Sequence, residues 1–177
     1  MSWRPGDRRA DTASMLRVDQ AGEYGATRIY AGQLAVLRRN CPEARLVARM
    51  AAQEERHLNR FNQLIAERRV RPTALQPLWN VAGFALGAAT ALMSEQAALA
   101  CTDAVETEID KHYREQLADL GDDDPELAAD IEEFRADELE HRDSARAGGA
   151  THAIGYPLLT AAIRAGCRVA IELSKRV

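Results

Sequence analysis

The sequence predicts an all-α protein, and three observations support this. Alanine, leucine, glutamate and arginine dominate the 177 residues, whereas aromatic residues make up only 5%, and the dominant side chains lose little rotamer freedom in a helix. Apolar residues recur at spacings of three and four, as on one face of a helix. No segment keeps the alternating pattern of a strand. A hydrophobic content of 46% and a charged content of 28% are typical of one globular domain with a sizeable core.

Prolines and glycines divide the chain into six helical segments. Pro42 and Pro125 suit the first turn of a helix, and Gly121 suits a helix C-terminus. The predicted helices cover approximately residues 12–39, 43–69, 78–93, 95–120, 125–146 and 153–176. We expect residues 1–14 to form a flexible N-terminal tail and residues 15–177 to form a single domain.

The third segment differs from the others because no charged residue occurs from Pro72 to Ser94. Its strongly apolar part is about 15 residues long, which is short of the roughly 20 residues needed to cross a bilayer. It is therefore either a buried helix or a helix that lies in a membrane interface. We expect a membrane surface to be one partner of the protein.

Charge and cysteine content exclude other classes of protein. The net charge is −4, so the chain has no overall basic character for nucleic acid, which we do not expect as a partner. The three cysteines are scattered, which argues against a disulfide framework and fits a reducing compartment. The first 13 residues lack an apolar signal core.

Two segments carry the same pair of potential metal ligands at the same spacing. Glu54 and His57 lie three residues apart, as do Glu138 and His141. Residues at this spacing project from one face of a helix, about one turn apart, so each pair could hold one metal ion. A single Glu-x-x-His match is a weak signal in a chain this rich in charge, but two such matches call for an explanation.

The preceding helices each carry a glutamate at a corresponding place. Glu23 comes 31 residues before Glu54, and Glu106 comes 32 residues before Glu138. Residues at one height in an antiparallel helix pair lie symmetrically about the turn. The midpoint of Glu23 and His57 is position 40, and that of Glu106 and His141 is 123.5. Both midpoints fall in predicted turns, so each glutamate is expected to face its Glu-x-x-His partner.

Together these residues predict a metal centre inside a helical bundle. Two such hairpins match the ligand arrangement of ferritin-like di-iron and di-manganese proteins. Four unpaired buried carboxylates would each cost several kcal/mol, whereas two divalent cations would balance their charge. Oxygen-rich ligation with one nitrogen per metal favours iron or manganese over zinc. The predicted fold is a ferritin-like four-helix bundle with two additional helices, one of them apolar, and the predicted metal ligands are Glu23, Glu54, His57, Glu106, Glu138 and His141.

The six predicted ligands could each be solvated charges, but their hairpin symmetry argues against this for the set. Three further side chains, Asp137, His112 and Tyr113, each have two possible interpretations. Asp137 could hydrogen-bond a ligand histidine of another helix or could be a surface charge. His112 and Tyr113 could form a proton or electron relay, since Tyr113 shares the face of Glu106, or they could be a hydrogen-bonded pair in the core.

Several stretches resemble the demethoxyubiquinone hydroxylase family of ubiquinone biosynthesis. The resemblance extends over nearly all of residues 16–177. It rests on residues 17–26, on 71–73 leading into the apolar run 77–87, on 101–106 with 112–113, on 134–141 and on 165–171. Other ferritin-like proteins lack the apolar third segment, so the combination is specific.

The resemblance implies an activity, cofactors and partners. It implies iron bound at the six predicted ligands, and oxygen-dependent hydroxylation of the ring of demethoxyubiquinol by this di-iron centre. Oxygen would be the co-substrate, and the electrons would come ultimately from NADH. The substrate would be a quinone with a polyprenyl tail. A lipid-binding partner protein of the same pathway is also implied, and assembly of the chain with copies of itself stays open.

The expected location is a membrane surface, and two other functions are also compatible with the sequence. We expect a peripheral membrane protein, on the cytoplasmic face of the cell membrane in a bacterium or on the matrix face of the mitochondrial inner membrane in a eukaryote. One rival is a ferritin-like ferroxidase or iron-binding protein, which would not need the uncharged segment. The other is a helical scaffold without a metal, for which the ligand symmetry would be coincidence.

Overall fold

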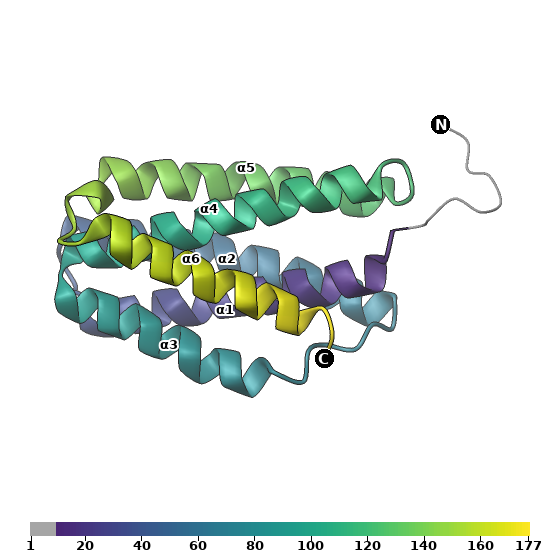
Figure 1. The fold of residues 1–177 in the computed structure, drawn as a ribbon, viewed down its shortest axis with the longest axis horizontal. Helices are drawn as coiled ribbons and strands as arrows, with labels where there is room; N and C mark the ends of the chain where they lie inside the picture. The colour runs from purple at the N-terminus through teal and green to yellow at the C-terminus, as the bar shows by residue number, and fades with distance from the viewer. Residues whose placement is uncertain (1–9) are drawn as a thin grey trace.

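The computed structural model describes residues 10–177, which form six α-helices, one short 3-10 helix and no strand (Figure 1). Residues 1–9, which make up most of the predicted tail, lie outside the described part of the chain. The elements are α1 (Thr12–Val36), α2 (Pro42–Glu67), α3 (Gln76–Met93), α4 (Glu95–Leu120), α5 (Pro125–Ala147), η1 (Ala150–His152) and α6 (Tyr156–Ser174).

Four of the helices form an antiparallel bundle made of two hairpins, α1–α2 and α4–α5. Helix α3 carries the chain back along the outside of the bundle against α1 and α4, so that α4 runs in the same direction as α2 (Figure 1). Helix α6 packs on α4. The predicted four-helix bundle with two additional helices, one of them apolar, is confirmed.

Local sequence explains where most of these helices begin and end. Asp11, Ser94 and Asp124 each accept a hydrogen bond from a backbone N–H at the start of a helix, at 3.0, 2.9 and 3.1 Å, which satisfies a donor that the helix itself cannot pair. Prolines stand in the first turns of α2, α3, α5 and α6, where no N–H is needed. Helix α4 ends at Gly121, whose φ of 51° few other residues adopt.

The last helix begins three residues later than predicted. The chain forms the 3-10 turn η1 after α5, and Gly155 then takes a left-handed conformation with φ of 70° before α6 starts. A left-handed residue breaks the run of helical hydrogen bonds, so the pattern from residue 153 could not continue as one helix. The first helix likewise ends at Val36, before the predicted residue 39, because Leu37 is extended.

Each bundle helix buries a stripe of residues that is apolar at both ends and polar in the middle. On α1 the stripe contains Leu16, Glu23 and Tyr30, spaced seven apart and at most 1% exposed, and buried Leu37 follows the end of the helix. The corresponding stripes of the other three bundle helices also carry their glutamates and histidines between apolar residues. Two apolar clusters therefore enclose a central polar layer at the middle of the bundle.

Small residues allow α3 to lie close against α1. A Cβ atom on Gly32 would collide with the backbone of Phe84, and one on Gly87 would collide with the backbone of Ile29. The buried face of α3 is correspondingly small, and it consists of Gly83, Gly87, Thr90 and Ala91. Gly32 thus serves the close helix packing that mid-helix glycine suggests, despite its cost in helix propensity.

The outer helix α6 is tied to the bundle by a buried carboxylate. Glu108 of α4 is 2% exposed, and it accepts hydrogen bonds from Arg164 at 2.7 Å and Arg168 at 2.9 Å. Trp79 of α3 donates its indole N–H to Ser174 of α6 at 3.1 Å. These contacts hold both additional helices in fixed places beside α4.

The two additional helices expose apolar side chains. All large hydrophobic residues exposed in the described part of the chain belong to α3 or to residues 154–177, including Val81 at 69% and Leu158 at 78%. Exposed apolar groups gathered in this way mark a surface that meets a partner or a membrane. Within residues 10–177, no helix combines the length and apolarity needed to cross a membrane.

We predict that Gly87→Ala destabilises the protein by about 1–3 kcal/mol, because the added methyl group pushes α3 away from the backbone of α1. Chemical denaturation followed by circular dichroism measures the change. Gly166→Ala is the matched control, since Gly166 lies in α6 with open space around its Cα and the alanine there raises helix propensity. Equal effects of the two substitutions would contradict the close packing of α1 and α3.

Candidate metal centre

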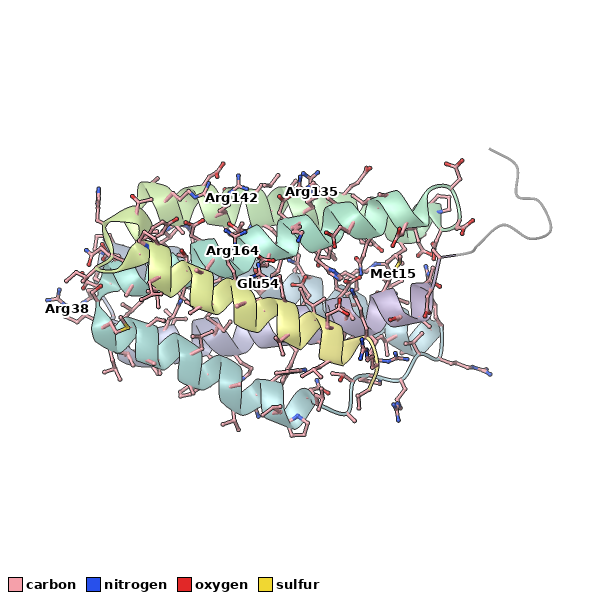
Figure 2. All side chains as sticks on the ribbon, viewed as in Figure 1. Met15, Arg38, Glu54, Arg135, Arg142 and Arg164 are labelled. Carbon is pink, nitrogen blue, oxygen red and sulfur yellow. The ribbon has the colours of Figure 1, made fainter. Side chains whose placement is uncertain are left out.

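The six predicted metal ligands meet in the central polar layer of the bundle. Helix α1 contributes Glu23, α4 contributes Glu106, and the two Glu-x-x-His helices contribute the rest. None of the six side chains is more than 1% exposed. Figure 2 shows Glu54 near the middle of the bundle, far from either end. The structure therefore brings together the whole predicted set, and its members are not solvated surface charges.

Their donor atoms form two groups that share two carboxylates. One group is Glu23, Glu54, His57 and Glu138, and the other is Glu54, Glu106, Glu138 and His141. The donor atoms within each group lie within 4.8 Å of one another. Glu54 and Glu138 belong to both groups, so these two carboxylates could be shared by two cations, whereas each remaining glutamate and histidine belongs to one group.

The histidines aim the same ring atom into the centre. His57 Nδ1 lies 3.2 Å from Glu138 Oε1 and 3.5 Å from Glu23 Oε2. His141 Nδ1 lies 3.1 Å from Glu54 Oε1 and 3.2 Å from Glu138 Oε2. Both Nδ1 atoms lack a hydrogen bond in the protein. A lone pair on each Nδ1 can therefore face a cation.

The charge balance of the cluster favours bound cations. Both carboxylate oxygens of Glu54 and of Glu138 are buried without a hydrogen bond, as is one oxygen of Glu23 and of Glu106. Burial, and then the charge of Glu138, raise the pKa of Glu54 and of Glu106 well above the ordinary value. Two divalent cations would satisfy these oxygens and keep the carboxylates ionised, so the residues fit a two-metal centre.

The outer nitrogen of each histidine is held by the opposite hairpin. His57 Nε2 lies 3.0 Å from Asp137 Oδ2, and His141 Nε2 lies 3.0 Å from Gln53 Oε1. A proton on Nε2 in each ring leaves Nδ1 free to bind a metal, so these contacts select the tautomer that ligation needs. Asp137 is thus the hydrogen-bond partner of a predicted ligand, which was one of its two predicted roles.

Two buried tyrosines contact the outer glutamates, Glu23 and Glu106, which each belong to only one donor group. Each tyrosine comes from the hairpin opposite to its glutamate. Tyr30 of α1 donates to Glu106 at 2.6 Å, and Tyr113 of α4 donates to Glu23. Burial raises the pKa of both tyrosines well above the ordinary value, and the nearby carboxylates add to this effect. Both hydroxyls therefore stay protonated and act as donors, which fixes the orientation of each carboxylate.

The two predicted relay residues have different surroundings. Tyr113 contacts a predicted ligand directly, whereas His112 Nε2 lies 3.4 Å from Asp19 Oδ1. Asp19 is 3% exposed and also accepts a hydrogen bond from Gln116 at 2.8 Å. A cavity of about 490 Å³ reaches His112 and Gln116 from the end of the bundle. The relay through His112 and Tyr113 stays a prediction.

Sequence analysis missed two residues of the centre that the internal repeat could have supplied. The hairpins repeat at an offset of 83 to 84 residues. Applied to Tyr113, an offset of 83 leads to Tyr30, and an offset of 84 leads from Asp137 to Gln53. The repeat therefore carries information about the residues around the ligands as well as the ligands themselves.

Comparison with known proteins identifies the family of this chain. A family model described as Ubiquinone biosynthesis protein COQ7 matches residues 10–174. The chain belongs to this family. The match covers all four helices of the bundle and both additional helices, so the resemblance inferred from the motifs is confirmed, and with it the ferritin-like fold.

Relatives from bacteria and eukaryotes carry the names of hydroxylases. The chain is 57% identical over 162 residues to the 3-demethoxyubiquinol 3-hydroxylase of Rhodospirillum rubrum, covering 92% of this chain and 76% of the relative. It is 51% identical over 172 residues to the mouse NADPH-dependent 3-demethoxyubiquinone 3-hydroxylase, mitochondrial, covering 95% and 79%. It is 44% identical over 179 residues to the 5-demethoxyubiquinone hydroxylase, mitochondrial, of Saccharomyces cerevisiae, covering 92% and 77%.

In the metal-free protein, we predict that Glu54→Gln raises stability at pH 8 by about 1 kcal/mol or more. Because the folded state raises the pKa of Glu54, folding takes up a proton there, which becomes more costly as the pH rises above the ordinary carboxyl value. The advantage of the variant therefore shrinks toward pH 4. Urea denaturation of chelator-treated protein at both pH values measures it. Glu55→Gln, at an exposed neighbouring position, is expected to have little effect at either pH.

Proposed function

We propose that this protein is a di-iron monooxygenase that hydroxylates the ring of demethoxyubiquinol in ubiquinone biosynthesis. The observation that carries the proposal is the buried set of four glutamates and two histidines whose donor atoms form two groups sharing Glu54 and Glu138. The names of the bacterial and eukaryotic relatives support the substrate. Oxygen-rich ligation with one nitrogen per metal supports iron.

The protein's own residues would orient the metal ligands and exclude bulk water. Iron bound at Glu23, Glu54, His57, Glu106, Glu138 and His141 would supply the oxygen chemistry, in which one atom of O₂ enters the ring as a hydroxyl and the other leaves as water. Tyr30 and Tyr113 hold the outer glutamates. Asp137 and Gln53 hold the histidines. The apolar clusters at both ends of the bundle keep the centre dry.

Tyr113 and His112 are the proposed relay toward the centre. Tyr113 meets the cluster at Glu23, and His112 lines the cavity at the end of the bundle. A relay through the pair would connect this cavity with Glu23 and would supply protons to the centre. The contact of His112 with Asp19 gives the relay a further polar group.

The electrons are proposed to come from a reduced nicotinamide coenzyme. The family resemblance implies NADH, whereas the name of the mouse relative contains "NADPH-dependent". Anaerobic reduction of the reconstituted protein with each coenzyme in turn compares them directly.

A membrane surface would deliver the polyprenyl quinone. The exposed apolar side chains of α3 and α6 are placed to enter the interface of a bilayer. The proposed location is peripheral, on the cytoplasmic face in a bacterium or on the matrix face of the mitochondrial inner membrane, and the mouse and yeast relatives are named mitochondrial. A lipid-binding partner protein and self-assembly complete the proposed partners.

Quinone analysis tests the substrate. Cells that lack this protein are expected to accumulate a quinone without one methoxy group, and the native gene is expected to restore ubiquinone. A normal quinone content in the deletion strain would refute the proposed substrate. A large cage in size-exclusion chromatography, together with normal quinone content, would favour the ferroxidase instead.

For the metal centre, we predict that Glu138→Gln lowers the iron bound after anaerobic reconstitution from two ions to one or none per chain, and lowers hydroxylation at least about 100-fold, because a bridging carboxylate loses its charge. Glu140→Gln removes the same charge from an exposed position on the same helix and is expected to keep both ions. Metal analysis and quinol turnover measure the two effects. Full iron content in the Glu138 variant would contradict its assignment.

For the membrane surface, we predict that Val81→Asn and Leu158→Asn each weaken binding to liposomes about tenfold, because each removes an apolar side chain worth roughly 1.5 kcal/mol or more on burial. Liposome flotation measures binding. Ala136→Asn, on the exposed surface of α5, is the control and is expected to bind like the native protein. Native-like flotation of both variants, or no flotation of the native protein, would refute this surface.

A further inference from the structure

The predicted ligands and the tyrosines that contact them repeat between the two hairpins, but the residues that contact the histidines do not. Gln53 precedes Glu54, and Asp137 precedes Glu138. Each of the two residues contacts the histidine of the opposite hairpin at the same distance, 3.0 Å, and at the same ring nitrogen. One histidine thus donates to a carboxylate and the other to a neutral amide, although the surrounding geometry is equivalent.

This difference changes how strongly each histidine can hold a cation. A carboxylate that accepts the outer N–H of an imidazole increases the basicity of the other ring nitrogen, and charge-assisted hydrogen bonds are roughly twice as strong as neutral ones. Arg56 also donates to Asp137 Oδ2, at 2.9 Å, but its side chain is 57% exposed, so water screens its charge. The carboxylate therefore keeps most of its effect on His57.

The residues near Glu23 and Glu106 also differ in charge, and the more negative surroundings are again those of the position that contains His57. Asp19 is buried one turn before Glu23, and one of its oxygens has no hydrogen-bond partner. The position that corresponds to Asp19 on α4, 83 residues later, is Thr102, and the neighbouring buried carboxylate of Asp103 forms an ion pair with Arg146 at 2.9 Å. Asp19 contacts His112 and Gln116, whereas Asp103 is paired with an arginine, so the negative charge near Glu23 is compensated less than that near Glu106.

We infer that the two metal positions are unequal, and that Asp137 makes the position formed by Glu23, Glu54, His57 and Glu138 the tighter of the two. Gln53 correspondingly leaves the position of Glu106 and His141 the weaker one. Asp137 and Gln53 are positioning residues, since they act through the histidines. This inference rests on the metal centre of the proposed function.

Titration of the metal-free protein with Co²⁺ tests the inference without turnover. The native protein is expected to bind two ions in two steps, with the first step at least about tenfold tighter, as followed by visible absorption and competition with a chelating dye. Proton NMR then identifies the histidines, because exchangeable N–H protons next to Co²⁺ have strongly shifted resonances. The resonance that appears with the first ion is expected to move in Asp137→Asn and not in Gln53→Glu.

The variants exchange the two acceptors with little change of shape. Asp137→Asn is expected to weaken the first step about tenfold, and Gln53→Glu to tighten the second by a similar factor. The double variant Gln53→Glu/Asp137→Asn keeps the net charge and is expected to fill the position of His141 first. Glu140→Gln is the control and should keep the native order, and circular dichroism establishes that every variant is folded.

The outcomes separate this inference from the proposed function. Binding of two ions in one step by the native protein, or an unchanged ratio of affinities in the double variant, would overturn the inequality and leave the two-metal centre standing. Binding of fewer than two ions by the native protein would overturn both.

Discussion

The burial of four carboxylates and two imidazoles at the centre of one helical bundle is the constraint on which the rest of the structure depends. Glu54 and Glu138 have no hydrogen bond to any of their side-chain oxygens, and an unpaired buried carboxylate costs several kcal/mol. The cluster therefore lowers the stability of the metal-free protein, and its residues fit bound cations. The apolar residues above and below it on each helix supply the stability that the centre lacks.

The hydrogen bonds around the centre cross from one hairpin to the other. Tyr30 reaches Glu106, Tyr113 reaches Glu23, and both histidines are held from the opposite hairpin. Each hairpin thus orients ligands of its partner, so neither hairpin could form half of the centre alone. The inferred inequality of the two metal positions depends on this crossed pattern, because Asp137 and Gln53 each contact the histidine of the other hairpin.

The two additional helices, α3 and α6, cover the outside of the bundle. Gly32 and Gly87 bring α3 close to α1, and Glu108 binds α6 through Arg164 and Arg168. Each helix also presents large apolar side chains outward, such as Val81 and Leu158. The same two helices therefore complete the fold and carry the exposed apolar side chains that we propose contact a membrane.

The sequence by itself determined the helices, the hairpin symmetry and the six inward-facing ligands, because helical periodicity and caps depend on residues close in the chain. The symmetry of each hairpin about its turn also aligned Glu23 with His57 and Glu106 with His141. Tertiary structure decided what depends on contacts between distant residues: that Glu54 and Glu138 belong to both donor groups, that Asp137 faces a histidine and that Glu108 is buried beneath α6. The end of α1 and the start of α6 were likewise set by the conformations of Leu37 and Gly155, which the apolar pattern does not encode.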